Sequence, residues 1–402
     1  MTSVEAPAGI PVVRPADLAE AAEAVRDAGR MLFRGGATKL AWGAPPQSIQ
    51  TVVDTRDLTR VVRHDAQDGV AVVEAGVGLD QLAELVAGHG QQLAVDDPAI
   101  AAGATVGGVI AAAADGPRRL RFGPVRGLVL GATVVLADGT VARSGGTVIK
   151  NVAGYDLMRL MTGSLGTLGL IAEVALRLHP LPVAAATVSA AGDADAAARA
   201  VGDLLASPLE PAALTWRDGR DGEDAELLVG FEGHAEAVEQ QCAAAGVRLS
   251  AAGMGTAEPV DEAVWSDVKA GMRANDGETV ARAVTLPSEL PGLAADLAAA
   301  AASTGTDATL ISQAGIGLHD AVLRGPATSQ AACVRQWRER VTARGGTVVA
   351  RDRAGGVADP DGVWDPHTVW GPPPPGFEPM RRIKQALDPL GRCAPGRHVG
   401  GL

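Results

Sequence analysis

The stretch ATVGGVIAAAADGPRRLRFGPVRGLVL, residues 104–130, is the most informative part of this chain. From Thr105 to Ala114 most side chains are Gly or Ala, so a backbone here can lie very close to a flat or extended ligand. A Thr just before a helix of small residues offers an N-cap hydroxyl, and the free amides of that helix terminus suit a negative group. Taken alone, the stretch also fits an alanine-rich core helix beneath a glycine turn.

Length and composition describe a globular chain of more than one domain. With 402 residues, 47% of them hydrophobic and 20% charged, the chain exceeds what one ordinary core accommodates. Only 3% of the residues are aromatic, so Ala, Val and Leu must build the core. The net charge is -12 and the arginines are scattered, which argues against a nucleic-acid-binding surface.

The sequence shows no targeting signal or metal-binding motif. The first residues, MTSVEAPAGIPVVRP, contain neither the basic nor the apolar region of a signal peptide. No charge-free apolar run approaches the about 18 residues that a transmembrane helix needs. Cys242, Cys333 and Cys393 lie far apart and form no CxxC motif, which argues against an iron–sulfur or zinc site. We therefore expect a cytoplasmic protein, with peripheral attachment at the inner face of the membrane only through partners.

A glycine pair follows the first strand that the pattern predicts, which is short. We expect a helix over 16–28 and a strand over 31–33, after which the chain continues as RGGATKLAWG, residues 34–43. A Gly-Gly pair directly after a strand, followed by Thr and Lys, can form a nest of backbone amides that binds phosphate. An ordinary turn is the alternative, and the spacing is not that of a Walker loop.

Alternating strands and helices continue to about residue 182 and indicate an α/β or α+β domain. The expected elements are strands at 51–53, 61–63, 70–74, 91–95 and 172–179, helices at 79–89 and 157–161, and a hairpin of 128–136 with 140–143. GSLGTLG, residues 163–169, has glycines spaced GxxGxxG before a strand. A Rossmann NAD site needs GxGxxG at the start of a helix, so that fold is disfavoured.

Beyond Pro182 the composition changes, and we expect a second domain to begin there. Two successive halves follow the same pattern, and each resembles the β-α-β-β-α-β unit of ferredoxin-like sheets. The first half has expected strands at 184–190, 212–216 and 226–231 and helices at 194–206 and 235–246. The second has strands at 281–286, 308–312, 316–323 and 347–351 and helices at 290–303 and 328–343. The remaining expectations are a helix over 258–273, a linker over 354–376 and a tail with a short helix over 379–402.

Four blocks of the sequence, taken together, resemble one family. They are RGGATKLAWG (34–43), DPAIAAGATVGGVIAAAADGPRRLRFGPVRGLVLGATVVLADG (97–139), VIKNVAGYDLMRLMTGSLGTLGLIAEVALRLHPLP (148–182) and DPLGRCAPGRH (388–398). They resemble the FAD-binding domain of the vanillyl-alcohol-oxidase/p-cresol-methylhydroxylase type. More narrowly, they resemble the FAD-binding subunit of bacterial glycolate oxidase, which is similar to the D-lactate dehydrogenase flavoproteins. The third block is the most specific, because GSxGTLG after KNVxGYDL is hard to obtain by chance.

The resemblance implies an α+β fold. We expect a two-lobed FAD-binding domain of the p-cresol-methylhydroxylase type at residues 1–182, with lobes at about 1–75 and 76–182. A ferredoxin-like α+β cap would occupy residues 183–375, and a C-terminal segment, 376–402, would return to the FAD domain. The match is close over residues 30–182 and loose over the cap.

The resemblance also implies which residues bind FAD. The first block would form the pyrophosphate nest with Arg34, Gly35, Gly36, Ala37, Thr38 and Lys39. The second would line the flavin side and let the cofactor lie flat, with Pro98, Gly103, Ala104, Thr105, Gly107, Gly108, Ala112, Ala113, Asp115, Gly116 and Gly123. The third would hold the opposite edge with Gly166, Thr167, Leu168, Gly169 and Ile171. Relatives with covalent flavin carry a His near the first loop, where this chain has Ala37 or Thr38, so we expect non-covalent FAD.

This chain departs from the family pattern at the positions that relatives use for catalysis and for metal binding. GSLGTLG has Leu165 where the catalytic relatives usually carry Glu. Those relatives also have a His-x-His cluster in the cap and a later His/Glu pair, which bind a divalent metal that holds the 2-hydroxy acid. Where that cluster would fall, QAGIGLHDAVL (313–323) offers His319 alone, so we expect no metal site and a structural His319. No two of the histidines are one or four residues apart; they are His64, His89, His179, His234, His319, His367 and His398.

Two functional hypotheses remain open, and both are FAD-dependent oxidoreductases that act on CH–OH donors. In the first, the chain is the FAD-binding subunit of a hetero-oligomeric glycolate oxidase, in which a sister flavoprotein oxidises glycolate to glyoxylate and an iron–sulfur subunit takes the electrons. In the second, it is a stand-alone dehydrogenase of D-lactate-like 2-hydroxy acids. There, Arg118, Arg119 and Arg121 would hold the carboxylate, unless they form a solvated basic turn.

No residue stands out as the catalytic base, which favours the subunit hypothesis. The one tyrosine, Tyr155, is expected to pack beside the cofactor. A third, weaker option is a scaffold that has lost the flavin. The small residues kept at 103–116 and 163–169 argue against it, because a lost site has no need for close approach.

Overall fold

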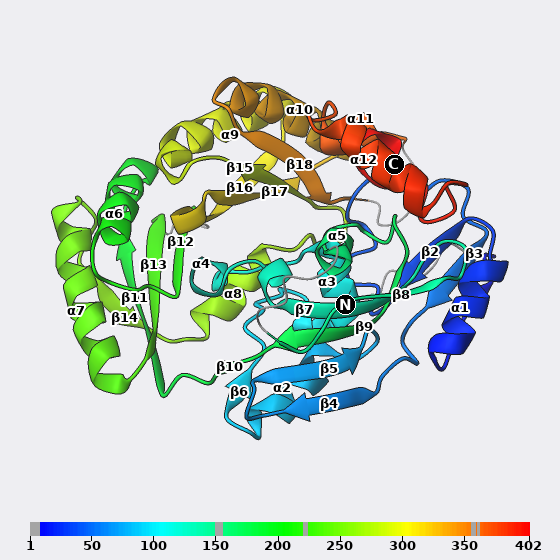
Figure 1. Ribbon diagram of the computed structural model, residues 1–402. Coiled ribbons are helices and arrows are strands. Elements are labelled where there is room, and N and C mark those ends of the chain that lie inside the picture. The colour runs from blue at the N-terminus through cyan, green and yellow to red at the C-terminus, as the bar shows by residue number, and fades with distance from the viewer. Residues whose placement is uncertain (1–8, 149–155, 220–223, 355–358, 360–361) are drawn as a thin grey trace. The chain divides into compact units, whose positions relative to one another are not determined.

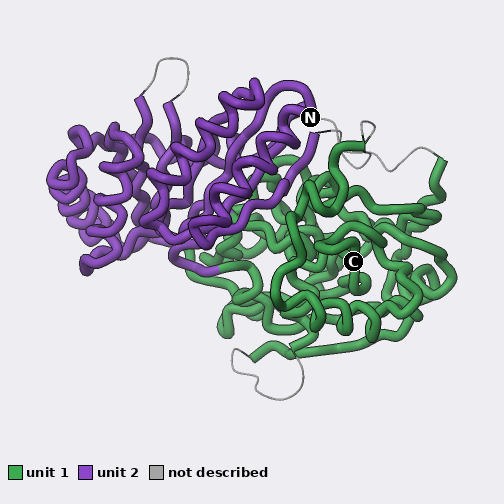
Figure 2. Tube along the Cα trace, turned by 90° about the horizontal axis from the view of Figure 1, so that it is seen from above, with its two compact units in different colours: residues 1–115, 124–181, 355–402 green, residues 116–123, 182–354 purple. Residues whose placement is uncertain are grey.

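The computed structural model describes residues 9–148, 156–219, 224–354, 359 and 362–402, and the chain divides into two compact units (Figure 2). Unit 1 comprises residues 1–115, 124–181 and 355–402, and unit 2 comprises residues 116–123 and 182–354. The domain division given by the resemblance, 1–182, 183–375 and 376–402, stays a prediction beside these units. None of the described helices is both long enough and apolar enough to cross a membrane.

Unit 1 opens with a three-stranded parallel sheet. Its strands, in the order β1-β3-β2, are β1 (Val12–Val13), β3 (Thr51–Asp54) and β2 (Met31–Arg34). Helix α1 (Leu18–Asp27) starts after Asp17, whose side chain caps the first turn. Its buried alanines and Val25 pack on Met31 and Val53. Because Arg34 and Asp54 are paired in register, the loops after β2 and β3 start side by side.

A five-stranded antiparallel sheet forms the larger part of unit 1 (Figure 1). In the order β4-β5-β9-β7-β8, its strands are β4 (Val61–Asp65), β5 (Val70–Glu74), β9 (Leu170–Arg177), β7 (Val129–Val135) and β8 (Val141–Gly145). One face packs on α2 (Leu79–Ala87), α3 (Val106–Ala112) and α5 (Leu157–Met161), and the other packs on α1. Strand β7 is therefore buried along its whole length. Its pairing with β8 confirms the predicted hairpin.

The strand predicted over 91–95 is wrong in extent. Only β6 (Gln91–Gln92) forms, and it pairs with β10 (His179–Pro180). In this register Ala94 and Val95 would have to pair with Arg177 and Leu176, which already pair with β5 as part of β9. The strand predicted to reach residue 179 is correspondingly divided into β9 and β10. Two 3-10 turns complete this part of the unit, η1 (Ile100–Ala102) and η2 (Val125–Gly127).

Unit 2 is built on one eight-stranded antiparallel sheet in the order β14-β11-β13-β12-β16-β17-β15-β18. Each half follows β-α-β-β-α-β, which confirms the predicted pair of ferredoxin-like units. The halves join where Trp216 pairs with Ser312 and Arg217 with Ile311. The first half contains β11 (Ala184–Ala191), α6 (Ala194–Ala206), β12 (Ala213–Arg217), β13 (Glu226–Gly233), α7 (Ala235–Ala251) and β14 (Glu258–Val260). The second contains β15 (Thr279–Val284), η3 (Pro287–Glu289), α9 (Leu290–Thr304), β16 (Asp307–Gln313), η4 (Ala314–Ile316), β17 (Leu318–Arg324), α10 (Ala327–Ala343) and β18 (Thr347–Asp352).

The helix predicted around Trp265, over 258–273, forms but is shorter than expected. Its first part is the edge strand β14, and only its second part is helical, as α8 (Val264–Gly271). Pro259 is tolerated in β14 because an edge strand has one unpaired side. Helix α8 packs on the sheet through Val268, which contacts Leu228 and Met272 in a small apolar cluster.

The segment 116–123 is an excursion from the glycine-rich stretch into unit 2. It carries the one-turn helix α4 (Arg119–Phe122). A Cβ on Gly315 would lie 3.1 Å from the side chain of Leu120, so this segment packs closely on the sheet of unit 2. Arg118 is also paired with Glu232 at 3.4 Å.

The C-terminal tail is anchored to unit 1 by a buried cation. After α11 (Pro366–Trp370), helix α12 (Phe377–Leu387) carries Lys384, whose Nζ donates to the carbonyls of Thr167 at 2.7 Å and Cys393 at 3.0 Å. The same Nζ lies 2.6 Å from the carboxylate of Asp388. Burial raises the pKa of Asp388, but hydrogen bonds from Lys384 and from two backbone amides outweigh it, so the pKa is lowered overall. A final 3-10 turn, η5, spans Val399–Gly401.

We predict that Lys384→Met lowers the free energy of unfolding of unit 1 by about 3 kcal/mol or more, because Asp388 then remains as a buried carboxylate without its cation. Urea unfolding at pH 7, followed by tryptophan fluorescence, measures the change. Arg382→Met, on an exposed position of the same helix, is the matched control and should leave the transition unchanged. Equal losses in the two variants would contradict the prediction.

Candidate functional site

A pocket of about 660 Å³ in unit 1 gathers most of the residues that the resemblance implied. It lies where the loop after β2, the start of α3 and the loop before β9 meet. The implied residues that line it are Arg34, Gly35, Gly36, Ala37, Thr38, Lys39, Thr105, Gly107, Gly108, Ala112, Gly166, Gly169 and Ile171.

The other implied residues lie outside this lining, and their roles stay predictions. Thr167 and Leu168 line a second pocket of about 600 Å³, with Lys384 and His398, on the other side of the same loop. Gly116 and Gly123 belong to the excursion into unit 2. Gly103 and Ala104 lie against Gly36 of the lining. The remaining ones are Pro98, Ala113 and Asp115. Tyr155 lies outside the described residues.

The loop after β2 presents free backbone amides. Ala37 has φ 58°, in the left-handed region that side chains other than glycine rarely adopt. The amides of Gly36, Ala37 and Thr38 find no acceptor in the described part of the chain. Successive amides beside a left-handed residue form an anion-binding nest, so this loop suits a phosphate.

Glycine at positions 35 and 36 is required by close contact with a second loop. A Cβ on Gly36 would lie 1.8 Å from the carbonyl oxygen of Gly103. A Cβ on Gly35 would lie 2.2 Å from Oγ1 of Thr105. No side chain fits at those distances, so the contact between these loops depends on both glycines.

Helix α3 starts at the pocket and presents backbone to it. Thr105 is its N-cap and accepts a hydrogen bond from the Gly108 amide at 3.3 Å, as the sequence predicted. A Cβ on Gly107 would lie 2.6 Å from the side chain of Ala75, so the helix can approach the end of β5 only with glycine there. This wall of the pocket is therefore flat and formed largely of main chain.

The loop before β9 closes the third side. Leu165 has φ 51°, and Gly166 has φ 76°. A Cβ on Gly166 would lie 3.1 Å from the ring of Phe33, which is another residue of the pocket wall. Two consecutive left-handed residues turn the chain sharply enough to bring this loop against the end of β2.

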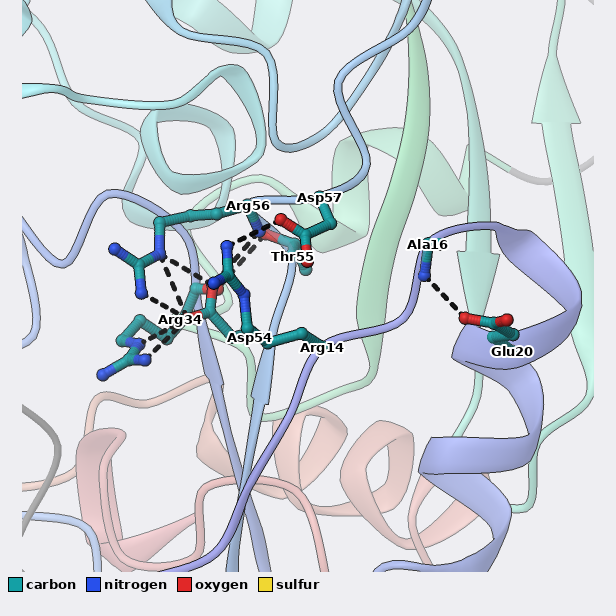
Figure 3. A network of polar contacts seen from close by, with 8 residues as sticks. All are labelled: Arg14, Ala16, Glu20, Arg34, Asp54, Thr55, Arg56 and Asp57. Atoms are coloured by element: carbon teal, nitrogen blue, oxygen red, sulfur yellow. Dashed lines mark hydrogen bonds and ion pairs between the residues drawn. The ribbon is translucent and has the colours of Figure 1, made fainter.

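A charged network holds Arg34 at the edge of the pocket. Figure 3 shows the side chains of Arg34 and Arg56 converging on Asp54, at 2.6 Å and 2.7 Å. Burial raises the pKa of Asp54, but the hydrogen bonds from Arg56 and Arg34 outweigh it, so the pKa is lowered and the carboxylate stays ionised. Thr55 ties the loop to β2 through a hydrogen bond from its Oγ1 to the Arg34 carbonyl.

Lys39, the other cation of the first loop, is buried and paired. Its Nζ lies 2.7 Å from the carboxylate of Asp97 and 5.8 Å from the centre of the Trp42 ring. Asp97 also accepts a hydrogen bond from the Ala99 amide at 2.6 Å. The positive charge of Lys39 is thus matched within the protein, and the amides of the loop remain the groups best placed to bind an anion.

Sequence reasoning missed eight residues of the lining, and Arg397 is the most informative of them. Arg397 is buried, at 4% exposure, and comes from the C-terminal block DPLGRCAPGRH. That block was one of the four that carried the resemblance, but no role in binding FAD was predicted for Arg397. The eight are Phe33, Leu40, Thr55, Ala75, Ala111, Leu165, Leu170 and Arg397.

His319, the residue expected where relatives hold a metal, is enclosed by hydroxyl groups. Its Nδ1 lies 2.8 Å from Oγ of Ser312, and its Nε2 lies 2.9 Å from Oγ1 of Thr285. Burial lowers the pKa of His319 to about 4, so the ring is neutral at pH 7. Within the described ranges, no group of three or more His, Cys, Asp or Glu side chains is placed to hold a metal ion.

The arginines proposed as carboxylate ligands are partly engaged elsewhere. Besides the pair of Arg118 with Glu232, Arg121 donates to the carbonyl of Glu210 at 3.3 Å and lies 3.9 Å from its carboxylate. Both arginines also lie against the ring of Phe122. These contacts favour the interpretation of this segment as a turn that packs within unit 2.

Two protein families match this chain. The family described as FAD binding domain matches residues 10–145, and the family described as FAD linked oxidases, C-terminal domain, matches residues 370–398. The first match contains two of the three loops of the pocket, and the second contains Arg397. The predicted resemblance and FAD as the cofactor are thereby confirmed.

Curated relatives are similar over part of this chain. D-lactate dehydrogenase of Archaeoglobus fulgidus is 39% identical over 173 residues, which is 42% of this chain and 38% of the relative. Glycolate oxidase subunit GlcD of Bacillus subtilis is 36% identical over 186 residues, 46% of this chain and 39% of the relative. Glycolate oxidase subunit GlcE of Escherichia coli is 36% identical over 160 residues, 40% of this chain and 45% of the relative. The matched part thus spans less than half the length of each of these relatives.

A solved structure shows the same fold. Alkyldihydroxyacetonephosphate synthase superposes with a TM-score of 0.70 at 16% sequence identity, and the match covers 96% of this chain and 75% of the other. At this identity the likeness concerns the fold alone. The predicted fold class, a FAD-binding domain of this type with a ferredoxin-like α+β part, is confirmed.

We predict that Gly36→Ala lowers the free energy of unfolding of unit 1 by about 1–3 kcal/mol and weakens FAD binding, because its Cβ would overlap the Gly103 carbonyl. Gly127→Ala is the control in the same unit, since a Cβ there meets nothing within 4 Å. Urea unfolding and titration of the apoprotein with FAD measure both effects. Unchanged FAD affinity in Gly36→Ala would show that this loop contact does not shape the site.

His319 gives a pH-dependent prediction. Because its folded pKa of about 4 lies below the ordinary value of 6.5, its contribution to stability is complete above pH 6.5 and is lost as the pH falls toward 4. The wild type should therefore lose about 3 kcal/mol more than His319→Gln between pH 7 and pH 4. Urea unfolding at the two pH values tests this, and an imidazole that titrates near 6.5 by NMR would contradict it.

Proposed function

We propose, from the FAD binding domain that residues 10–145 form, that this chain is the FAD-binding subunit of a complex that oxidises 2-hydroxy acids. Glycolate, oxidised to glyoxylate, is the substrate we propose for the complex. The relatives named above support this proposal, because they include two glycolate oxidase subunits and a D-lactate dehydrogenase.

Three loops of this chain would hold FAD without a covalent bond. The amides of Gly36, Ala37 and Thr38 suit the pyrophosphate, and the flat start of α3 suits an extended part of the cofactor. Among the described residues that line the pocket there is no His, Cys or Tyr side chain to attach a flavin. When bound, FAD supplies the chemistry of hydride acceptance from a C–H bond beside a hydroxyl group.

The enclosed state of His319 is the observation that carries the subunit proposal. A histidine that is buried and hydrogen-bonded at both nitrogens serves the fold of unit 2. Arg118 and Arg121 likewise form pairs inside that unit. We therefore propose that catalysis takes place on a partner flavoprotein subunit and that an iron–sulfur subunit accepts the electrons. A cytoplasmic location, with attachment to the membrane through these partners, belongs to the same proposal.

A stand-alone dehydrogenase of D-lactate-like acids is the second candidate. The similarity to the Archaeoglobus fulgidus D-lactate dehydrogenase favours it. In this case the chain's own residues would have to bind the carboxylate and remove the hydroxyl proton. The described contacts single out no residue for either role.

We expect that the purified chain, loaded with FAD, is not reduced by glycolate or D-lactate alone. Anaerobic absorption spectra would keep the visible flavin band with either acid, whereas dithionite should bleach it and so show that the bound flavin can be reduced. Addition of a partner flavoprotein should give glycolate oxidation. Rapid bleaching by either acid without a partner would instead establish the stand-alone candidate, and failure to take up FAD would contradict both.

A further inference from the structure

Arg397 joins two loops of the pocket through their backbone carbonyls. Its Nη2 donates to the carbonyls of Lys39 at 2.9 Å and Leu40 at 3.2 Å, and its Nε donates to that of Trp42 at 3.2 Å. Its Nη1 donates to the carbonyl of Leu165 at 3.2 Å. One buried guanidinium thus binds the loop after β2 and the loop before β9 at the same time.

The backbone of Arg397 reinforces the same junction. Its carbonyl accepts hydrogen bonds from the Ala44 amide at 2.9 Å and from Nε1 of Trp370 at 3.1 Å. The tail residue is therefore fixed to the end of the first glycine loop independently of its side chain. The backbone bonds fix where the side chain starts, and the guanidinium spans from there to the carbonyls of both loops.

The planar guanidinium of Arg397 fixes the relative positions of the carbonyls that it binds, besides attracting them. Its N–H groups point in fixed directions, so the four carbonyls it binds must hold fixed positions relative to one another. Each carbonyl shares a rigid peptide plane with the next amide, and therefore the orientation of that amide is also set. Both loops contribute walls of the pocket, and Arg397 itself lines it.

We propose that Arg397 is a positioning residue for FAD, which sets the separation of the two glycine loops between which the cofactor is held. The inference rests on the proposed function only through FAD binding and is independent of the substrate. It makes the C-terminal tail a part of the cofactor site, so that FAD binding and docking of the tail stabilise each other.

Arg392 provides a matched control on the same tail. It also donates to backbone carbonyls, among them those of Val25 at 2.8 Å, Ala137 at 3.0 Å and Gly29 at 3.3 Å, and to that of Ala28. None of these carbonyls belongs to a residue of the pocket lining. Arg392 therefore anchors the tail by the same chemistry without touching the site.

The test compares Arg397→Lys with Arg392→Lys in the full chain. A lysine keeps the charge but cannot reproduce the fixed fork. We expect the Kd for FAD, measured by titration of the apoprotein, to rise by about tenfold or more in Arg397→Lys and by less than about twofold in Arg392→Lys. The thermal unfolding midpoint of both apoproteins should fall by similar amounts. Equal changes of Kd in the two variants, or an unchanged Kd in Arg397→Lys, would overturn the proposal.

A measurement on the wild type keeps the proposal falsifiable if Arg397→Lys does not fold. Hydrogen exchange of the apoprotein and the FAD-saturated protein should show that FAD protects the amides of residues 391–402 as well as those of the glycine loops. Protection confined to the loops would overturn the proposal. Absence of FAD binding by the wild type would overturn the proposed function and this inference together, whereas absence of hydroxy-acid oxidation would leave this inference intact.

Discussion

The contact between two main-chain segments, Gly35–Gly36 and Gly103–Thr105, is the constraint on which the site depends. The carbonyl of Gly103 occupies the place where a side chain at position 36 would begin. The first segment ends a strand of the parallel sheet, and the second leads into α3, which packs on the five-stranded sheet. Their contact therefore fixes the two parts of unit 1 at the point where a cofactor would lie. Where the two segments are this close, main-chain groups form the wall of the pocket.

The charges around the pocket also favour backbone amides as the groups that bind an anion. Arg34 shares Asp54 with Arg56, and Lys39 is paired with Asp97, so two cations of the first loop already have carboxylate partners. Buried ions without partners would be costly in a protein that must also fold without its cofactor. Amide dipoles avoid that cost, because they are neutral and are held in place by the loop itself. The chain thus combines a net charge of -12 with a site suited to phosphate.

Local patterns predicted the elements and the glycine loops, and long-range contacts decided the rest. Thr105 as an N-cap and the two ferredoxin-like repeats follow from spacing over a few residues, and both were predicted correctly. The excursion of residues 116–123 was not predictable in this way, because nothing in a short basic turn says which sheet it will join. The bond between Arg397 and Lys39 spans 358 residues of sequence, so no local pattern could reveal that this Arg lines the pocket.

The position of Arg397 also bears on what the two family matches mean physically. They are separated by more than half of the chain, and unit 2 is formed by most of the residues between them. Yet the pocket takes residues from both, and Arg392 ties the second region to the first through a hydrogen bond to the backbone carbonyl of Val25. A hydrogen bond to a backbone carbonyl depends on the position of the backbone and not on which side chain the accepting residue carries. These hydrogen bonds therefore require the cations of the tail but place no requirement of their own on the side chains of the residues whose carbonyls accept them.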